Sequence, residues 1–282
     1  MLLASVLAAS VLAAESAELA GARALFEAGR FPEAKLAFER LLAAEPANAD
    51  VHYYLGRLAL DRGDDDTAIS ELGRAEELAP GSARVHGALG NAYGRSAQKA
   101  GLLSKYGLAR KCVAEFERAA ALEPANVGYH ESLLEFYYRA PSLVGGGSEK
   151  AANEAAIIMR LDPRRGHRAY ATLDLANGKY DLAFAELEEV LKSAPDDYAS
   201  LYQLGRLAAL SGHNLDRGLG ALRTCLKLKE PQGAPSHAAA QWRVGNILER
   251  KGDAAGARVA YESALRLDPK FTPASEALEK LR

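Results

Sequence analysis

Cysteine is scarce in this sequence: Cys112 and Cys225 are the only two in 282 residues, and they lie far apart. A disulfide framework or a cysteine zinc site needs several cysteines at short, regular spacings, so both are excluded. Free cysteine usually behaves as a small buried hydrophobe. We therefore expect both thiols to lie in the core.

An excess of basic charge is missing as well. The 35 Lys and Arg residues are balanced by 37 Asp and Glu residues, which leaves a formal net charge of −2 at pH 7. Proteins that bind nucleic acid concentrate positive charge to attract phosphates, so no nucleic-acid partner is expected. Hydrophobic residues make up 49% of the chain, which is enough to bury a large core.

No integral membrane span is expected. The apolar run from Leu2 to Ala14 carries no charge, but as a helix it would measure only about 21 Å, whereas the hydrocarbon layer is about 30 Å thick. Its length and the small residues around Ala13 fit a secretory signal peptide. Residues 1–14 are therefore predicted to be a signal peptide and the protein to be periplasmic or secreted. Because no Lys or Arg precedes the run, an Ala-rich first helix of a cytoplasmic protein is the alternative.

The common sequence motifs of catalysis are absent too. There is no Gly-x-Ser-x-Gly elbow, no His-Glu-x-x-His and no Cys-x-x-Cys. The run Gly145–Lys150 has no strand before it and lacks the Gly-Lys-Ser/Thr order of a phosphate-binding loop. We expect neither enzyme activity nor a cofactor.

What the sequence does contain is a period of 32 to 44 residues. Apolar helical patterns end repeatedly at a proline, which stops one helix and leads into the next. A glycine lies midway between most successive prolines, where it suits the left-handed conformation just past a helix end. Each repeat is therefore predicted to be a helix, a short turn and a second helix. The prolines are Pro46, Pro80, Pro124, Pro163, Pro195, Pro231 and Pro269, and the turn glycines are Gly29, Gly63, Gly178, Gly212 and Gly252.

Small residues also recur inside the predicted helices. A glycine within a helix costs about 1 kcal/mol relative to alanine, so its recurrence at one position indicates a close approach of two helix backbones. The first helices carry Gly56, Gly90, Gly205 and Gly245, and the second helices carry Ala34, Ala68, Ala183 and Ala257.

This pattern resembles the tetratricopeptide repeat family, whose helical hairpins of 34 residues carry Leu-Gly, a turn glycine, Ala, an aromatic residue, Ala and Pro at set places. Residues 49–80 and 238–269 match it well. The resemblance implies an all-α fold, a right-handed α-solenoid of about seven hairpins. The hairpins are expected at residues 15–48, 49–82, 83–126, 127–163, 164–197, 198–235 and 236–269, with a capping helix at 270–282.

Four histidines, His52, His86, His130 and His167, recur near the start of successive repeats. Packed helices lie about 8–10 Å apart, whereas zinc–nitrogen bonds measure about 2 Å. A row with the spacing of the repeats is therefore too wide to bind one ion. We expect these histidines to pack between helices, and no metal site is predicted.

Two of the expected hairpins carry insertions at their internal turns, between Tyr93 and Cys112 and between Ala140 and Glu149. Equivalent turns of neighbouring repeats fall on one edge of a solenoid, so the apolar residues of the two insertions are expected to lie close together. They form either a small satellite core or a contact for a partner. These residues are Leu102, Leu103, Tyr106, Leu143 and Val144.

The resemblance also implies where a partner binds, because first helices of tetratricopeptide arrays line a concave groove that holds a peptide or a helix. Arginine recurs on this face, and arginine pairs bidentately with carboxylates. We expect a groove that favours an acidic segment or a chain-terminal carboxylate, unless these arginines pair with Glu and Asp of adjacent repeats. The candidate residues are Tyr53, Arg57, Asn91, Arg95, Tyr138, Arg139, Arg168, Tyr202, Arg206 and Trp242.

Two functions fit such a chain. The first is a non-catalytic scaffold that binds a protein or peptide, exported to a bacterial periplasm. The alternative is an architectural or self-assembling subunit of an envelope-associated complex, which would use the edge insertions or the terminal helix. Light scattering distinguishes them, because a stable oligomer without a partner favours the second.

Overall fold

A computed structural model describes residues 17–281, so the predicted signal peptide at residues 1–14 lies outside the described residues. Every regular element within 17–281 is a helix. A helix at 17–27 is followed by α2 (Phe31–Ala44), α3 (Ala49–Arg62), α4 (Asp65–Leu78), α5 (Ala83–Lys99), α6 (Leu102–Leu122), α7 (Val127–Arg139), the 3-10 helix η1 (Ser142–Val144), α8 (Ser148–Leu161), α9 (Pro163–Ala176), α10 (Tyr180–Ser193), α11 (Tyr198–Ser211), α12 (Leu215–Cys225), α13 (His237–Arg250), α14 (Ala254–Leu267) and α15 (Thr272–Lys280).

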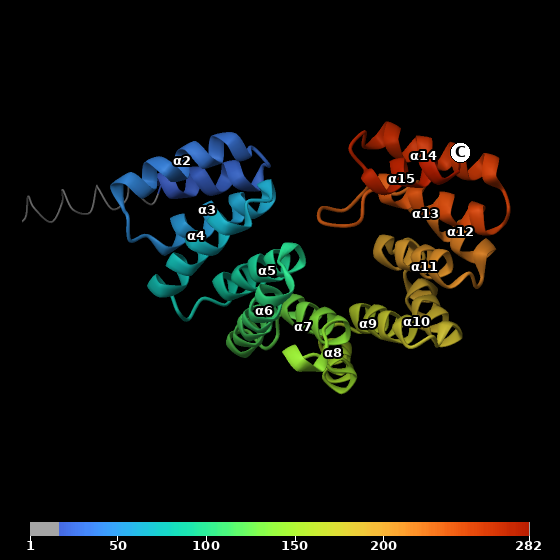
Figure 1. The fold of residues 1–282 in the computed structure, drawn as a ribbon, viewed down its shortest axis with the longest axis horizontal. Coiled ribbons are helices and arrows are strands. Elements are labelled where there is room, and N and C mark those ends of the chain that lie inside the picture. The colour runs from blue at the N-terminus through green and yellow to red at the C-terminus, as the bar shows by residue number, and fades with distance from the viewer. Residues whose placement is uncertain (1–16, 282) are drawn as a thin grey trace, which may run out of the picture. The chain divides into compact units, whose positions relative to one another are not determined.

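The chain divides into two compact units, Met1–Gly147 (unit 1) and Ser148–Arg282 (unit 2). Within each unit, helices that follow one another in the chain pack side by side (Figure 1). In unit 1, α3 packs on α4, α4 on α5, and α5 on α6; in unit 2 the same order runs from α8 to α15. Serial packing of helical hairpins defines an α-solenoid, so the predicted fold class is confirmed.

The recurrent glycines of the first helices are the points where the hairpins close. A Cβ atom on Gly90 would lie 2.6 Å from the Phe116 ring, and one on Gly245 would lie 2.3 Å from the Tyr261 ring. The corresponding contacts join Gly56 to Leu72 and Gly205 to Leu222. Real Cβ atoms do not approach so closely, so the predicted close approach of the helices is confirmed.

The turns follow the prediction as well. The five turn glycines have φ angles between +71° and +81°. This is the left-handed region of the backbone, which residues with a side chain rarely adopt. The two cysteines are buried and free. None of the described helices is long and apolar enough to cross a bilayer.

The first insertion lengthens the third hairpin unequally. Helix α5 has 17 residues and α6 has 21, whereas α3 and α4 have 14 each. The second insertion does not extend α7, which has 13 residues, and folds instead into η1. Helix α6 is therefore about two turns longer than α4, the second helix of the preceding hairpin.

The periodic histidines lie between helices, as predicted. The Nδ1 atom of His52 lies 2.7 Å from Glu71 Oε2, and its Nε2 atom lies 3.0 Å from the carbonyl oxygen of Pro46. His86 makes the same two contacts with Glu115 and Pro80. Each ring therefore joins the second helix of its hairpin to the turn before the first helix.

Candidate binding pocket between α5, α6 and α7

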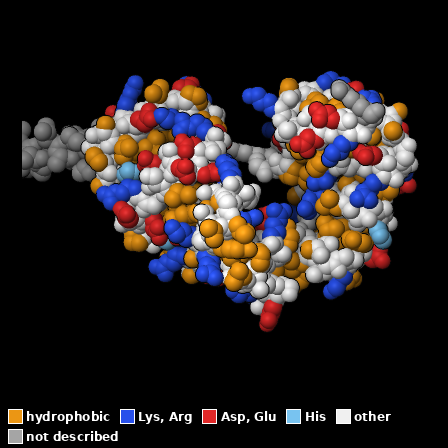
Figure 2. Space-filling model, in the orientation of Figure 1, with side chains coloured by type: hydrophobic (Ala, Val, Ile, Leu, Met, Phe, Trp, Pro, Cys, Tyr) orange, Lys and Arg blue, Asp and Glu red, His pale blue; other side chains and the backbone are white. Residues whose placement is uncertain are grey.

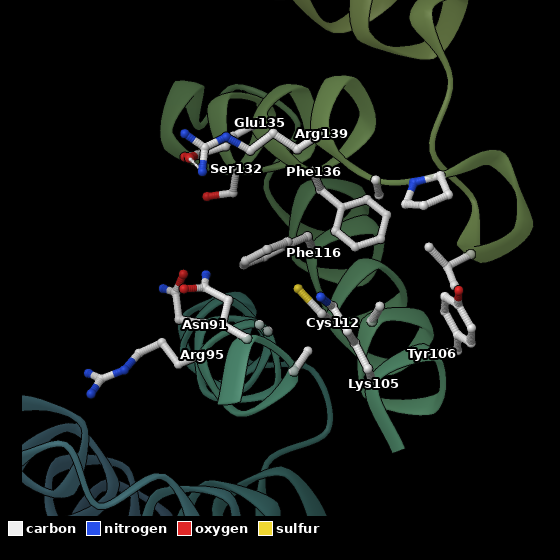
Figure 3. A pocket seen from close by; sticks show the side chains of 18 of the residues that line it. Asn91, Arg95, Lys105, Tyr106, Cys112, Phe116, Ser132, Glu135, Phe136 and Arg139 are labelled. Atoms are coloured by element: carbon white, nitrogen blue, oxygen red, sulfur yellow. Dashed lines mark ion pairs between the residues drawn. The ribbon is translucent and has the colours of Figure 1, made fainter. Parts of the chain in front are cut away.

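A pocket of about 620 Å³ opens between α5, α6, α7 and η1 of unit 1 (Figure 3). Its floor is apolar: Cys112 and Phe116 of α6 are almost fully buried, and so is Val144 of η1. Phe136 of α7 forms part of the wall. The size lies in the range of about 300–1,000 Å³ that is usual for ligand-binding clefts.

Two glycines on α5 explain why the pocket between α5 and α6 is open. Phe116 packs against Gly90 at a distance that leaves no room for a Cβ atom, and the Cys112 Sγ atom would lie 3.2 Å from a Cβ on Gly94. Both α6 side chains therefore lie low against the α5 backbone. Larger residues at these glycine positions would push the two side chains into the pocket.

The two insertions close one end of the pocket. Leu102 and Tyr106, from the first turns of α6, line it together with Val144 of η1. A hydrogen bond from the Arg110 guanidinium to the carbonyl oxygen of Leu143, 3.1 Å long, ties η1 to α6. Residues from both insertions thus form part of the pocket wall.

Among the cations at the pocket, Arg95 is already paired. Its Nε atom lies 3.1 Å from Asp65 Oδ1, and its guanidinium donates to the carbonyl oxygen of Leu60. Asp65 also pairs with Lys99 at 2.6 Å. Arg95 therefore holds the preceding hairpin against α5, and Figure 3 shows its side chain directed away from the pocket.

Lys105 and Arg139 are the cations that remain available. Lys105 is exposed, makes no ion pair with a described residue, and extends across the pocket in Figure 3. Arg139 pairs with Glu135 one turn earlier at 3.3 Å, and its Nε donates to the Tyr138 hydroxyl at 2.8 Å. That hydrogen bond is the main reason why the pKa of Arg139 is raised. Because Arg139 is 57% exposed, its ion pair is weak and open to exchange.

Burial raises the pKa of the Cys112 thiol to about 12, and the charge of Glu115 adds to this effect. The sulfur therefore stays protonated at neutral pH. Because nucleophilic attack needs a thiolate, Cys112 contributes apolar surface to the pocket and no reactivity.

The pocket brings together six of the residues singled out from the sequence: Asn91, Arg95, Arg139, Leu102, Tyr106 and Val144. Leu103 and Leu143 do not line it; their side chains are 95% and 62% exposed. Figure 2 shows hydrophobic side chains on the surface over this part of unit 1.

Two other predicted groove residues of unit 1, Tyr53 and Arg57, are hydrogen-bonded to each other. Tyr53 is buried, and its hydroxyl accepts a hydrogen bond of 2.8 Å from Arg57. The Arg57 guanidinium also lies 5.5 Å from the centre of the Phe26 ring. These contacts join the first two hairpins.

The remaining predicted groove residues belong to unit 2. Arg168 pairs with Asp197 at 3.1 Å, with both side chains largely buried. Trp242 has the Arg243 guanidinium 4.0 Å from its ring centre and packs on Phe271. Tyr202 and Arg206 are half-buried. The alternative in which groove arginines pair with acidic residues of adjacent repeats thus holds for Arg95 and Arg168.

Three pocket residues were not predicted from the sequence: Lys105, Phe116 and Phe136. Lys105 stands beside Tyr106 in the first insertion, so the insertion itself was the available signal. Phe116 occupies the recurrent aromatic position of a second helix, where a repeat pattern predicts only core packing. Nothing in the local sequence shows that α5 and α7 leave the space above it open.

The tetratricopeptide repeat family matches residues 19–83, 168–214 and 207–270, which is more than half of the chain. The chain therefore belongs to the tetratricopeptide repeat family. No curated protein matches it at a significant level.

Solved structures share this fold at low sequence identity. A tetratricopeptide repeat protein from Parabacteroides merdae is 14% identical with a TM-score of 0.70, and the match covers 95% of this chain and 98% of that one. Yeast Tom70 is 16% identical with a TM-score of 0.65, over 89% of this chain and 51% of Tom70. The human IFIT1 dimer with m7Gppp-AAAA is 20% identical with a TM-score of 0.57, over 89% of this chain and 54% of IFIT1. At these identities the likeness concerns the fold alone.

Proposed function

We propose that this chain is a non-catalytic scaffold that binds a segment of a partner protein, and that the pocket between α5, α6, α7 and η1 receives a large apolar side chain of that segment. The observation that supports the proposal is the pocket itself. Its floor of Phe116, Cys112 and Val144 can bury an apolar group, and its rim offers polar side chains that fix an orientation.

The charge at the rim favours an acidic segment or a chain-terminal carboxylate. Lys105 has no ion pair with a described residue, and Arg139 is held only by an exposed contact with Glu135. An incoming carboxylate can pair with Lys105 and compete for Arg139. Arg57 and Arg95, although on the predicted groove face, are used inside unit 1.

Fluorescence anisotropy with a library of labelled peptides tests this proposal. Ala109 lines the pocket, so Ala109→Phe should fill it and weaken binding at least about tenfold, which corresponds to about 1.4 kcal/mol. Leu103→Ala, on the same helix but outside the pocket, is the control and should leave affinity unchanged. Equal affinities of the wild type and Ala109→Phe would contradict the pocket as the binding site.

Charge is tested separately. Lys105→Ala should weaken the binding of peptides with an acidic or C-terminal carboxylate, most clearly at low salt, where surface charges are screened least. Neutral, amidated forms of the same peptides should bind the wild type and Lys105→Ala with equal affinity. Lys270→Ala, at an exposed position of unit 2, is the matched control. If amidated and free peptides respond alike to Lys105→Ala, the carboxylate is not what is recognised.

A self-assembling subunit is the second candidate function, and the exposed leucines favour it. Leu102, Leu103 and Leu143 are 68%, 95% and 62% exposed, and clustered exposed apolar residues often mark an interface. Light scattering of the wild type should then show an oligomer that Leu103→Ser dissociates. A monomer at all concentrations favours the peptide scaffold.

We propose no nucleic-acid partner, although the structure of IFIT1 with m7Gppp-AAAA shares the fold. The formal net charge of −2 argues against the counterion release that drives binding to phosphates. Titration with a capped RNA at low salt should show no change in anisotropy. The proposed periplasmic or secreted location is supported by the apolar run at residues 2–14, and cell fractionation tests it.

A further inference from the structure

Three side chains with metal-ligand chemistry converge away from the pocket. They come from consecutive helices: Glu76 from α4, His86 from α5 and Glu115 from α6. The His86 Nδ1 atom lies 2.7 Å from Glu115 Oε2 and 3.8 Å from Glu76 Oε1. All three potential ligand atoms lie within 4.8 Å of one another.

The hydrogen bond on the far side of the His86 ring fixes which nitrogen faces the carboxylates. Nε2 lies 3.0 Å from the carbonyl oxygen of Pro80, and a carbonyl oxygen can only accept, so Nε2 carries the hydrogen. Histidines that bind metals usually donate their second N–H to a carbonyl or carboxylate in this way. The lone pair of Nδ1 therefore faces the oxygen lone pairs of the two carboxylates. Either a proton or a metal cation must lie between these atoms.

Comparison with the sister repeats shows what is particular to His86. His52 faces Glu71 at the same distance of 2.7 Å, and Glu71 is the one carboxylate that pairs with it among the described residues. Glu76, the third-last residue of α4, adds a second carboxylate at His86. At the corresponding position of α2, the helix that precedes the His52 helix, the residue is Leu42, which has no carboxylate.

The second carboxylate leaves an excess of negative charge that one proton on His86 cannot balance. Among the described residues, His86 is the only partner with which Glu76 and Glu115 form an ion pair, so the two carboxylates are poorly compensated by the protein alone. A neutral imidazole and two carboxylates would instead balance a divalent cation. The Glu76 side chain is 37% exposed and that of His86 only 5%, so an ion could enter from solvent past Glu76.

We propose that Glu76, His86 and Glu115 form a binding site for a divalent transition-metal ion of the Zn²⁺ type, which joins α4 to the α5–α6 hairpin. Zinc takes imidazole and carboxylate ligands at about 2.0–2.2 Å, so ligand atoms around a tetrahedral ion lie about 3.3–3.6 Å apart. The present separations from His86 Nδ1, 2.7 Å to Glu115 and 3.8 Å to Glu76, lie on either side of that range. Water fills the fourth position. This site uses one histidine and two carboxylates, so it does not require two histidines of the periodic row to bind the same ion.

Isothermal titration calorimetry of the full chain without an affinity tag, using Zn²⁺ alone, tests the site. The wild type should bind one ion per chain. Glu76→Gln should bind at least about 100-fold more weakly, since even outer contacts of a metal ligand are worth 10- to 100-fold. Glu71→Gln is the matched control, because it breaks the corresponding contact of His52 and should leave Zn²⁺ affinity unchanged.

Two further measurements separate the loss of a ligand from the loss of the fold. Far-UV circular dichroism of Glu76→Gln without metal should match the wild type, and Zn²⁺ should raise the unfolding temperature of the wild type only. Bound Co²⁺ should give visible absorption bands in the wild type that Glu76→Gln lacks. Equal Zn²⁺ affinities of the wild type and Glu76→Gln, or no binding at micromolar Zn²⁺, would overturn the proposal. Neither result depends on whether the α5–α7 pocket binds a peptide.

Discussion

At the scale of single residues, the glycine on the first helix sets how closely a hairpin can pack. Gly245 faces the ring of Tyr261, which is fully buried. The Tyr261 hydroxyl accepts a hydrogen bond of 2.9 Å from the Asn246 amide and donates one of 2.8 Å to the Glu249 carboxylate, so the ring has little freedom to move aside. We expect Gly245→Ala to lower the free energy of unfolding by about 1–3 kcal/mol, the usual cost of overpacking. Urea denaturation measures this.

A glycine without a facing side chain provides the control. Gly220 lies inside α12, and a Cβ there would meet nothing within 4 Å. Gly220→Ala should raise the free energy of unfolding by about 0.4–1 kcal/mol, because alanine restricts the unfolded chain and favours the helix. A Gly245→Ala protein as stable as the wild type would contradict the packing argument.

The buried cysteines give a prediction about pH. Burial raises the pKa of Cys112 from 9.0 to about 12, and it also raises that of Cys225. Because the folded pKa is the higher one, the contribution to stability is complete below pH 9 and is lost as the pH rises from 9 toward 12. A thiolate-specific reagent at pH 8 should label neither cysteine in the native protein and both in denaturant. Rapid labelling of the native protein would contradict their burial.

At the scale of elements, Asp197 does two things at the start of α11. Its carboxylate accepts a hydrogen bond of 2.9 Å from the Ser200 backbone N–H and pairs with Arg168 of α9. Asp197→Ala should lower the free energy of unfolding of unit 2 by about 1–3 kcal/mol, because it removes the N-cap of α11 and leaves Arg168 without its carboxylate. Asp197→Asn keeps the cap, because Asn caps as well as Asp, and should cost less. Equal losses in the two variants would contradict a capping role.

The elements were the most predictable part of the fold. Proline and glycine act on their own backbone, so the turn at Gly63 and the helix end before Pro80 could be predicted from neighbouring residues alone. The fate of the insertions could not. Whether extra residues extend α5, extend α6 or form a 3-10 turn such as η1 depends on what they pack against.

At the scale of the whole molecule, the two compact units should respond separately to destabilisation, because a repeat contacts only its neighbours. Leu222 is fully buried in unit 2, and Leu222→Ala should cost about 2–5 kcal/mol there. Trp242, the single tryptophan, belongs to unit 2. Its fluorescence in urea should therefore report a lower midpoint than far-UV circular dichroism, which also follows unit 1.

The reciprocal variant completes this test. Leu89 is fully buried in unit 1. Leu89→Ala should lower the urea concentration at which unit 1 unfolds, as followed by circular dichroism, and leave the midpoint of the Trp242 fluorescence transition unchanged. If Leu89→Ala shifts both probes equally, the chain unfolds as one cooperative body.

The candidate pocket was predictable only in part. Asn91, Arg139 and Tyr106 could be singled out because a repeat pattern assigns each position to a face or an edge. The pattern could not show that Arg95 pairs with Asp65, while Lys105 makes no ion pair with any residue in the described part of the chain. Those outcomes depend on side chains from hairpins that are distant in sequence.

The sequence by itself determined that this chain is a series of helical hairpins, because periodic apolar residues, prolines and glycines act through local backbone preferences and a repeated packing contact. Only the tertiary structure decided which charges are neutralised, where a pocket stays open above Phe116, and that Glu76 of one hairpin meets His86 and Glu115 of the next. The reason is that burial, ion pairing and metal-ligand geometry depend on distances between atoms of different helices, which no local pattern encodes.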